Sequence, residues 1–80
     1  MIEVLYFASL REAVGVAKSS HDLGGATVAD LVDNLKSQGE PWTSALEGQL
    51  LCSVNQEMAS FDAVLNDGDE LALFPPVTGG

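Results

Sequence analysis

The sequence predicts an α+β fold, in which one amphipathic helix packs on one face of a mixed β-sheet. Two observations lead to this prediction. The clearest helical apolar stripe lies in residues 27–39. Short, apolar runs rich in β-formers lie before and after it. A chain of 80 residues holds one hydrophobic core and therefore one domain.

The N-terminal quarter predicts two strands joined by an elaborated loop. Residues 2–7 form a short apolar run that is typical of a strand. Residues 10–14 are helix formers that stop at Gly15, so we expect one short turn of helix there. Residues 17–23 form a more polar strand, which ends at two glycines.

The main helix begins after Thr27, a favourable N-cap residue. Asp30, three residues later, completes an acidic form of the capping box. Gly39 ends the helix, and Pro41 prevents it from resuming. The apolar residues of this segment fall on one stripe at helical spacing and predict the face that packs on the sheet: Val28, Leu31, Val32 and Leu35.

The second half of the chain predicts a further helical turn and three strands. The turn covers residues 42–46, a strand covers residues 50–54, and a short strand surrounds Met58. Residues 66–69 carry the strongest turn signal in the chain. The last strand covers residues 70–74 and pairs in parallel with the first.

Side-chain alternation places apolar residues on both faces of this sheet. Glu3, Leu5 and Phe7 share one face of the first strand, and Phe74 shares a face with Glu70 in the last. If the helix covers the opposite face, Leu5, Phe7 and Phe74 lie on an open face, as in a partner-binding surface. The alternative is that loops cover these rings.

Charge and composition exclude several classes of function. Three basic residues against twelve acidic residues give a formal charge of −9, which disfavours binding to nucleic acid or to an anionic membrane surface. The acidity either attracts a basic partner or only maintains solubility. One cysteine, no signal-peptide pattern and no apolar run of about 18 residues predict a cytoplasmic protein without a membrane span.

The C-terminus carries the most informative chemistry. Pro75 and Pro76 favour extended geometry, so we divide the chain into a domain of residues 1–74 and an extended functional tail of residues 75–80. Gly79 and Gly80 lack Cβ atoms, which allows a narrow channel to admit the backbone and leaves the terminal carboxyl carbon unhindered. A carboxylate in this position is suited to adenylation, although glycine-rich ends are also common as frayed tails.

Residues 74–80, Phe-Pro-Pro-Val-Thr-Gly-Gly, resemble the C-terminal signature of the molybdopterin synthase small subunits. The resemblance continues through residues 65–71, 54–56 and 7–12, and it covers essentially the whole chain. It implies a ubiquitin-like β-grasp fold, with a mixed sheet packed on one main helix.

The same resemblance implies a sulfur-carrier cycle. An ATP-dependent, E1-like activating enzyme would adenylate the Gly80 carboxylate, and a sulfurtransferase system would convert it to a thiocarboxylate. The tail would then enter the large subunit of molybdopterin synthase and donate sulfur to cyclic pyranopterin monophosphate. The chain would bind no cofactor itself, and it would be the non-catalytic, sulfur-donating subunit of a heterotetramer.

The resemblance also assigns roles to single positions. Gly80 would carry the sulfur, and Gly79 would let it enter the pocket. Arg11 would pair with an acidic group on a partner, unless it is only a solvated helix end. The remaining partner contacts would come from two places, the sheet face and the tail: Phe7, Met58, Phe74, Pro75, Pro76, Val77 and Thr78.

Other reactive residue types do not form a site in the sequence. Cys52 lies in an apolar strand, where a buried and inert thiol is the commoner case. His21 has no second ligand near it, so it predicts no metal site. Trp42 is interpreted as a packing residue beside the helix end, and the acids of residues 67–70 as turn residues.

Three alternatives remain open from the sequence. The chain would serve as a sulfur carrier in thiamine or amino-acid biosynthesis, as a protein modifier that is joined to lysines, or as an interaction domain without covalent chemistry. Isopeptide adducts on lysines would identify the modifier. An interaction domain would keep its function without Gly79 and Gly80.

Overall fold

The computed structural model describes residues 1–76 and contains five strands and three helices. The N-terminal half comprises β1 (Ile2–Tyr6), α1 (Ser9–Val14), β2 (Lys18–His21) and α2 (Val28–Lys36). The C-terminal half comprises α3 (Trp42–Ala45), β3 (Leu51–Val54), β4 (Glu57–Ala59) and β5 (Glu70–Phe74). The predicted order of elements is confirmed.

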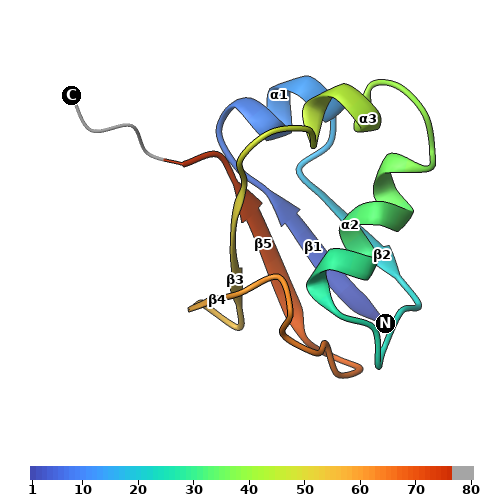
Figure 1. Cartoon of the computed structure of the whole chain (residues 1–80), viewed down its shortest axis with the longest axis vertical. Helices are drawn as coiled ribbons and strands as arrows, with labels where there is room; N and C mark the ends of the chain where they lie inside the picture. The colour runs from blue at the N-terminus through green and yellow to red at the C-terminus, as the bar shows by residue number, and fades with distance from the viewer. Residues whose placement is uncertain (77–80) are drawn as a thin grey trace.

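The strands form one mixed sheet in the order β2-β1-β5-β3-β4. β1 and β5 pair in parallel at its centre, as predicted, and the other neighbours are antiparallel. The carboxyl ends of β1 and β5 therefore point toward the same end of the molecule, where α1 and α3 lie (Figure 1). A single main helix on such a sheet is the β-grasp arrangement that the resemblance implied.

The helix α2 begins where the sequence predicts. The Asp30 backbone N–H donates to Thr27 Oγ1 at 3.1 Å, and the Thr27 N–H donates to Asp30 Oδ2 at 3.2 Å. This capping box satisfies two of the backbone donors that a helix start leaves without partners. The predicted apolar stripe is buried, and three of its residues have no exposed surface: Val28, Leu31 and Leu35.

The core lies between α2 and one face of the sheet. Ile2 and Val4 of β1 have no exposed surface, and Tyr6 is almost as deeply buried. In the parallel register Val4 pairs with Leu71 and Tyr6 with Leu73, so these leucines of β5 point to the same side. We call this side the helix face.

Strand ends differ from the sequence prediction by one to two residues. β1 ends at Tyr6 rather than Phe7, although the Phe7 N–H still donates to the Leu73 carbonyl at 3.2 Å. The predicted strand of residues 17–23 shortens to Lys18–His21, although the Ala17 carbonyl still accepts from the Tyr6 N–H at 3.0 Å. Among the described residues, no helix is long and apolar enough to cross a membrane.

Candidate functional site

The second face of the sheet carries a group of large apolar side chains. Phe7 is 48% exposed and Met58 is 65% exposed, so no described element covers these side chains. Leu51 is also exposed, and Leu5 and Phe74 are partly buried. We call these five residues the open-face patch: Leu5, Phe7, Leu51, Met58 and Phe74.

The strand register assembles the patch from four strands. Leu5 pairs with Ala72, which pairs with Ser53, and Ser53 pairs with Met58. These four positions form one row across the sheet, and its two central members, Ala72 and Ser53, are almost fully buried. Paired residues of neighbouring strands point to the same face. The row therefore places Leu5 and Met58 on one face, on either side of two small residues.

A second row lies closer to the start of the tail. Leu51 pairs with Phe74, and Phe7 follows β1 beside the same end of β5. Pro75 and Pro76 continue directly from this row and are partly buried. The tail therefore begins at the edge of the open-face patch. A partner that covers the patch would lie beside the point from which the tail departs.

A hydrogen-bonded clamp holds the opposite end of β5. The Glu70 N–H donates to Asn55 Oδ1, and Asn55 Nδ2 donates to Asp69 Oδ1, both at 3.0 Å. The Asn66 N–H donates to Asp69 Oδ2 at 2.8 Å. These bonds to Asp69, from the Asn66 backbone and then from Asn55, lower the pKa of its carboxyl. The clamp joins the β3–β4 turn to β5, and so supports the register that aligns the patch.

Most predicted site residues with a described position belong to this arrangement. Phe7, Met58 and Phe74 lie in the patch, and Pro75 and Pro76 adjoin it. Arg11 lies on α1, which begins two residues after Phe7, and its side chain is exposed. Within residues 1–76 it forms no ion pair. The other four predicted residues lie outside the described residues: Val77, Thr78, Gly79 and Gly80.

Leu51 belongs to the patch, although its sequence pattern did not predict it as a site residue. In β3 both Leu51 and its neighbour Cys52 are apolar, so alternation alone does not indicate which of them faces the helices. The pairing of Leu51 with Phe74 decides the question. The sequence alone gives only an indirect criterion for Leu51: if it pairs with Phe74, it lies on the same face of the sheet.

Cys52 and Trp42, which were not predicted as site residues, lie outside the open-face patch. Cys52 is 1% exposed, its Sγ donates to the Ala59 carbonyl at 3.3 Å, and burial raises the pKa of its thiol. A buried thiol with a raised pKa is a poor nucleophile. Trp42 packs edge-on against Tyr6, with ring centroids 5.4 Å apart, which confirms a packing role.

His21 ends a short polar chain on the helix face at the edge of the sheet. Ser19 Oγ lies 2.8 Å from both the Tyr6 hydroxyl and His21 Nε2. Burial lowers the pKa of His21, which favours its neutral form. Each of these three side chains has a hydrogen-bond partner within the group, so the presence of His21 has a structural explanation.

Comparison with known proteins identifies the family. The ThiS family model matches residues 4–80. The molybdopterin synthase sulfur carrier subunit of Escherichia coli strain K12 is 49% identical over 81 residues, covering all of both chains. Small archaeal modifier protein 1 of Haloferax volcanii is 38% identical, covering 92% of this chain and 94% of the relative.

A solved structure supports the fold independently of these alignments. The putative molybdopterin converting factor subunit 1 of Pyrococcus furiosus superposes with a TM-score of 0.77 at 33% identity, covering 95% of this chain and 97% of the other. The predicted fold and the predicted family are both confirmed. The chain belongs to the ThiS family, and its full-length relatives include the molybdopterin synthase sulfur carrier subunits.

Proposed function

We propose that this chain is the sulfur-carrying subunit of a molybdopterin synthase, with Gly80 as the residue that carries the sulfur. The full-length similarity to sulfur carrier subunits supports this proposal. The observation that carries it is the position of the open-face patch beside the start of the tail. In this proposal residues 1–74 form the docking domain and residues 75–80 the functional tail.

Two successive bond changes would load the carrier. ATP converts the Gly80 carboxylate to an acyl-adenylate and releases pyrophosphate, in the active site of an E1-like activating enzyme. A sulfurtransferase system then supplies a sulfur nucleophile that displaces AMP at the carbonyl carbon. The product is a thiocarboxylate, in which one sulfur replaces one carboxylate oxygen. The chain itself holds no cofactor in this scheme, because ATP is bound by the activating enzyme.

The large synthase subunit would then receive the tail. Its docking buries the open-face patch, and Arg11 pairs with an acidic group on that partner. The Gly80 sulfur bonds to cyclic pyranopterin monophosphate, and water then cleaves the bond between this sulfur and the Gly80 carbonyl carbon, which returns the carrier to a carboxylate. Each pterin needs two sulfurs, so two loaded carriers are consumed for each product. We place this cycle in the cytoplasm, in a heterotetramer with two large subunits.

The mass of the protein, isolated with its native activating system, tests the proposal directly. Replacing oxygen by sulfur adds about 16 Da, as does oxidation of methionine or cysteine, so fragmentation must assign the change to Gly80. A change confined to Gly80 supports the sulfur-carrier proposal. An unchanged Gly80 carboxylate, with ATP, activating enzyme and sulfur donor all present, would contradict it.

Substitution of the terminal residue separates function from folding. Gly80→Ala is expected to abolish most sulfur transfer while changing the free energy of unfolding by less than about 0.5 kcal/mol, because a terminal residue contributes little to folding. Transfer and thermal unfolding are measured on the same preparation. A large fall in melting temperature would instead indicate that Gly80 is part of the folded domain.

Protein modification is a second candidate function. The observation that favours it is the 38% identity to small archaeal modifier protein 1 of Haloferax volcanii. The same acyl-adenylate would then react with a lysine amine, which forms an isopeptide bond and releases AMP. Isopeptide adducts of this chain on cellular lysines, joined through Gly80 and lost in a variant without Gly79 and Gly80, would favour this function. Their absence in cells that contain loaded carrier would exclude it.

A further inference from the structure

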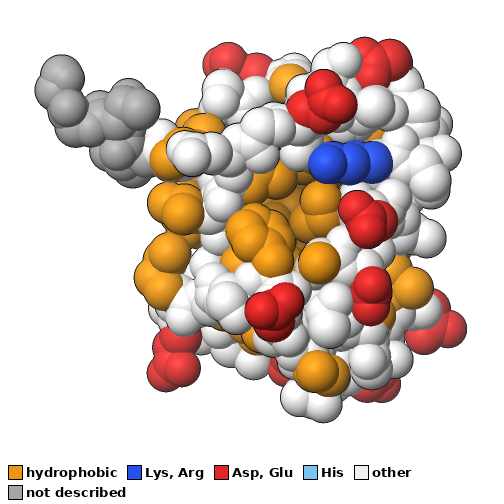
Figure 2. Space-filling view, viewed as in Figure 1, with side chains coloured by type: hydrophobic (Ala, Val, Ile, Leu, Met, Phe, Trp, Pro, Cys, Tyr) orange, Lys and Arg blue, Asp and Glu red, His pale blue; other side chains and the backbone are white. Residues whose placement is uncertain are grey.

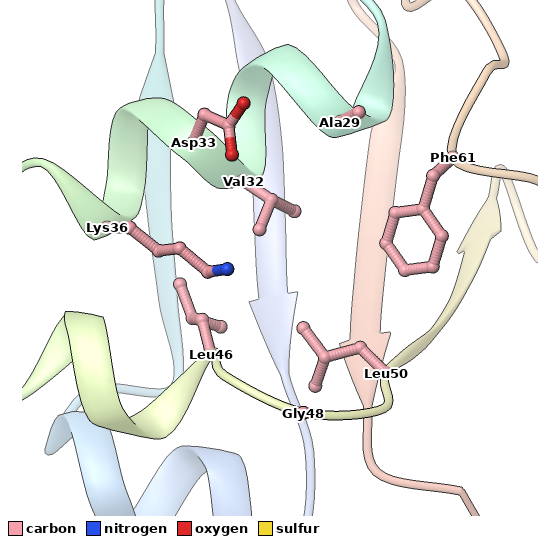
Figure 3. A pocket seen from close by; sticks show the side chains of 8 residues that line it. All are labelled: Ala29, Val32, Asp33, Lys36, Leu46, Gly48, Leu50 and Phe61. Carbon is pink, nitrogen blue, oxygen red and sulfur yellow. The ribbon is translucent and has the colours of Figure 1, made fainter.

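A second surface feature lies on the helix face and plays no part in the proposed cycle. It is a hollow of about 190 Å³ that opens to solvent (Figure 3). Three segments far apart in the sequence form it: α2, the connection between α3 and β3, and the segment after β4. We call it the helix-face hollow, and its lining residues are Ala29, Val32, Asp33, Lys36, Leu46, Gly48, Leu50 and Phe61.

The size and the walls of the hollow suit one apolar side chain. Leu46 and Val32 are buried, and Leu50 and Phe61 are partly buried. Figure 2 shows hydrophobic side chains gathered in a depression on this face of the molecule. Sites for cofactors and drug-sized ligands usually measure about 300–1,000 Å³. The helix-face hollow is smaller, so it matches an anchoring side chain better than a cofactor.

The charges at the hollow favour a basic partner. Asp33 lines it, and exposed Glu47 and Asp62 directly adjoin the lining residues Gly48 and Phe61 in the sequence. Lys36 is the single basic residue of the lining. Acidic side chains surround the depression on several sides, with one basic side chain beside it (Figure 2). With a formal charge of −9 on the whole chain, the field attracts cations.

The hollow and the open-face patch share no residue. Leu50 lines the hollow, whereas its neighbour Leu51 belongs to the patch, because successive residues of an extended chain point to opposite sides. The hollow lies on the face covered by α2 and the patch lies on the other. A partner bound to the patch therefore leaves the hollow accessible.

We propose that the helix-face hollow is a second docking site, which takes a leucine-like side chain flanked by lysine or arginine in a partner protein. Asp33 attracts the flanking cations, and the apolar walls enclose the anchor. Lys36 opposes such a partner and limits its affinity. This proposal does not rest on the sulfur chemistry of Gly80, and it allows two partners to bind the chain at once.

The test is an NMR titration of the isotope-labelled protein with a capped peptide, a leucine flanked on both sides by lysines. The expected result is that amide signals of Ala29, Val32 and Gly48 shift, and that the same peptide with serine in place of leucine binds more weakly. Shifts centred on Phe7 and Met58 would overturn the proposal, as would equal binding of the serine peptide.

Charge variants provide the sharper part of the test. Asp33→Asn is expected to weaken binding of the peptide about two- to fivefold. The control is Asp22→Asn, which changes the charge equally at an exposed position after β2. Lys36→Gln is expected to tighten binding by a similar factor, relative to Lys18→Gln on the open face. Weaker peptide binding in Lys36→Gln would mean that Lys36 contributes to binding instead of opposing it, and would overturn the proposal.

A further variant tests whether the helix-face hollow binds the peptide independently of the open-face patch. Phe7→Ser removes a ring of the open-face patch and leaves the lining of the hollow intact. The peptide affinity of this variant is expected to equal that of the unmodified protein. A loss of affinity would mean that the two surfaces form one site, contrary to the proposal.

Discussion

The two faces of the sheet are built from the same strands but have opposite properties. On the helix face, Ile2, Val4 and Leu73 have no exposed surface. On the open face, Phe7 and Met58 expose about half or more of their surface. Burial of apolar area stabilises the fold at roughly 25 cal/mol per Å², so the helix face supplies stability. The open face retains apolar area that only a partner would bury.

This difference indicates how an 80-residue domain divides its apolar residues between folding and binding. A domain of this size buries a smaller fraction of its surface than a larger one does. Large apolar side chains left exposed in a coherent patch therefore point to a partner surface.

Truncation on the helix face should cost the most stability. Leu73→Ala is expected to lower the free energy of unfolding by about 2–5 kcal/mol, because it leaves a cavity in the hydrophobic core. Urea denaturation measures the change. Met58→Ala on the open face is the matched control and should change stability by less than about 0.5 kcal/mol. Equal losses of stability in both variants would refute the inference that the helix face, and not the open face, supplies stability.

Truncation on the open face should act on binding instead. Phe74→Ala is expected to weaken binding to the large synthase subunit by about 2 kcal/mol, roughly 30-fold, as an aromatic anchor at an interface would. Isothermal titration calorimetry measures the affinity. Glu47→Ala, an exposed change near the other face, is the control. Unchanged affinity of Phe74→Ala would mean that the partner binds elsewhere.

Removal of the α2 cap should affect folding but not this binding. Thr27→Ala loses the side-chain half of the capping box and is expected to cost about 1 kcal/mol of stability. Thermal unfolding measures the cost. Affinity for the large subunit should remain unchanged, because Thr27 lies away from the patch. A coupled loss of affinity would show that α2 helps to shape the open face.

The smallest expected effect is a pH dependence at the edge of the helix face. Burial lowers the pKa of His21 below its ordinary value of 6.5, so the unfolded chain binds more protons in the window just below pH 6.5. Stability should therefore rise as the pH increases through that window, and level off above it. In His21→Gln this rise should disappear, while the loss of stability at lower pH that comes from the lowered pKa of Asp69 remains. An identical pH profile in the variant would refute the contribution of His21.

Local sequence signals predicted the elements and the alternation of the strands. The capping box at Thr27 and the stripe of α2 follow from spacing and propensity. The parallel pairing of β1 with β5 was expected from the layout of the elements, and the register confirms it. Phe7 and Phe74 were assigned to the open face from alternation alone. The pairing of Phe74 with Leu51 agrees with this assignment, and Phe7, which follows the end of β1, is 48% exposed. Boundaries were less accurate, because strand ends depend on the hydrogen bonds of neighbouring strands.

The main helix, the succession of strands along the chain and the chemistry proposed for Gly80 could be predicted from the sequence, because each depends on residues close together in the chain. Three further features emerge only when the chain is folded. Leu51 joins the open-face patch through its pairing with Phe74. Asn55 clamps Asp69 and Glu70, across 14 and 15 positions of sequence. The helix-face hollow forms where three distant segments meet. Each depends on long-range register, which local periodicity does not encode.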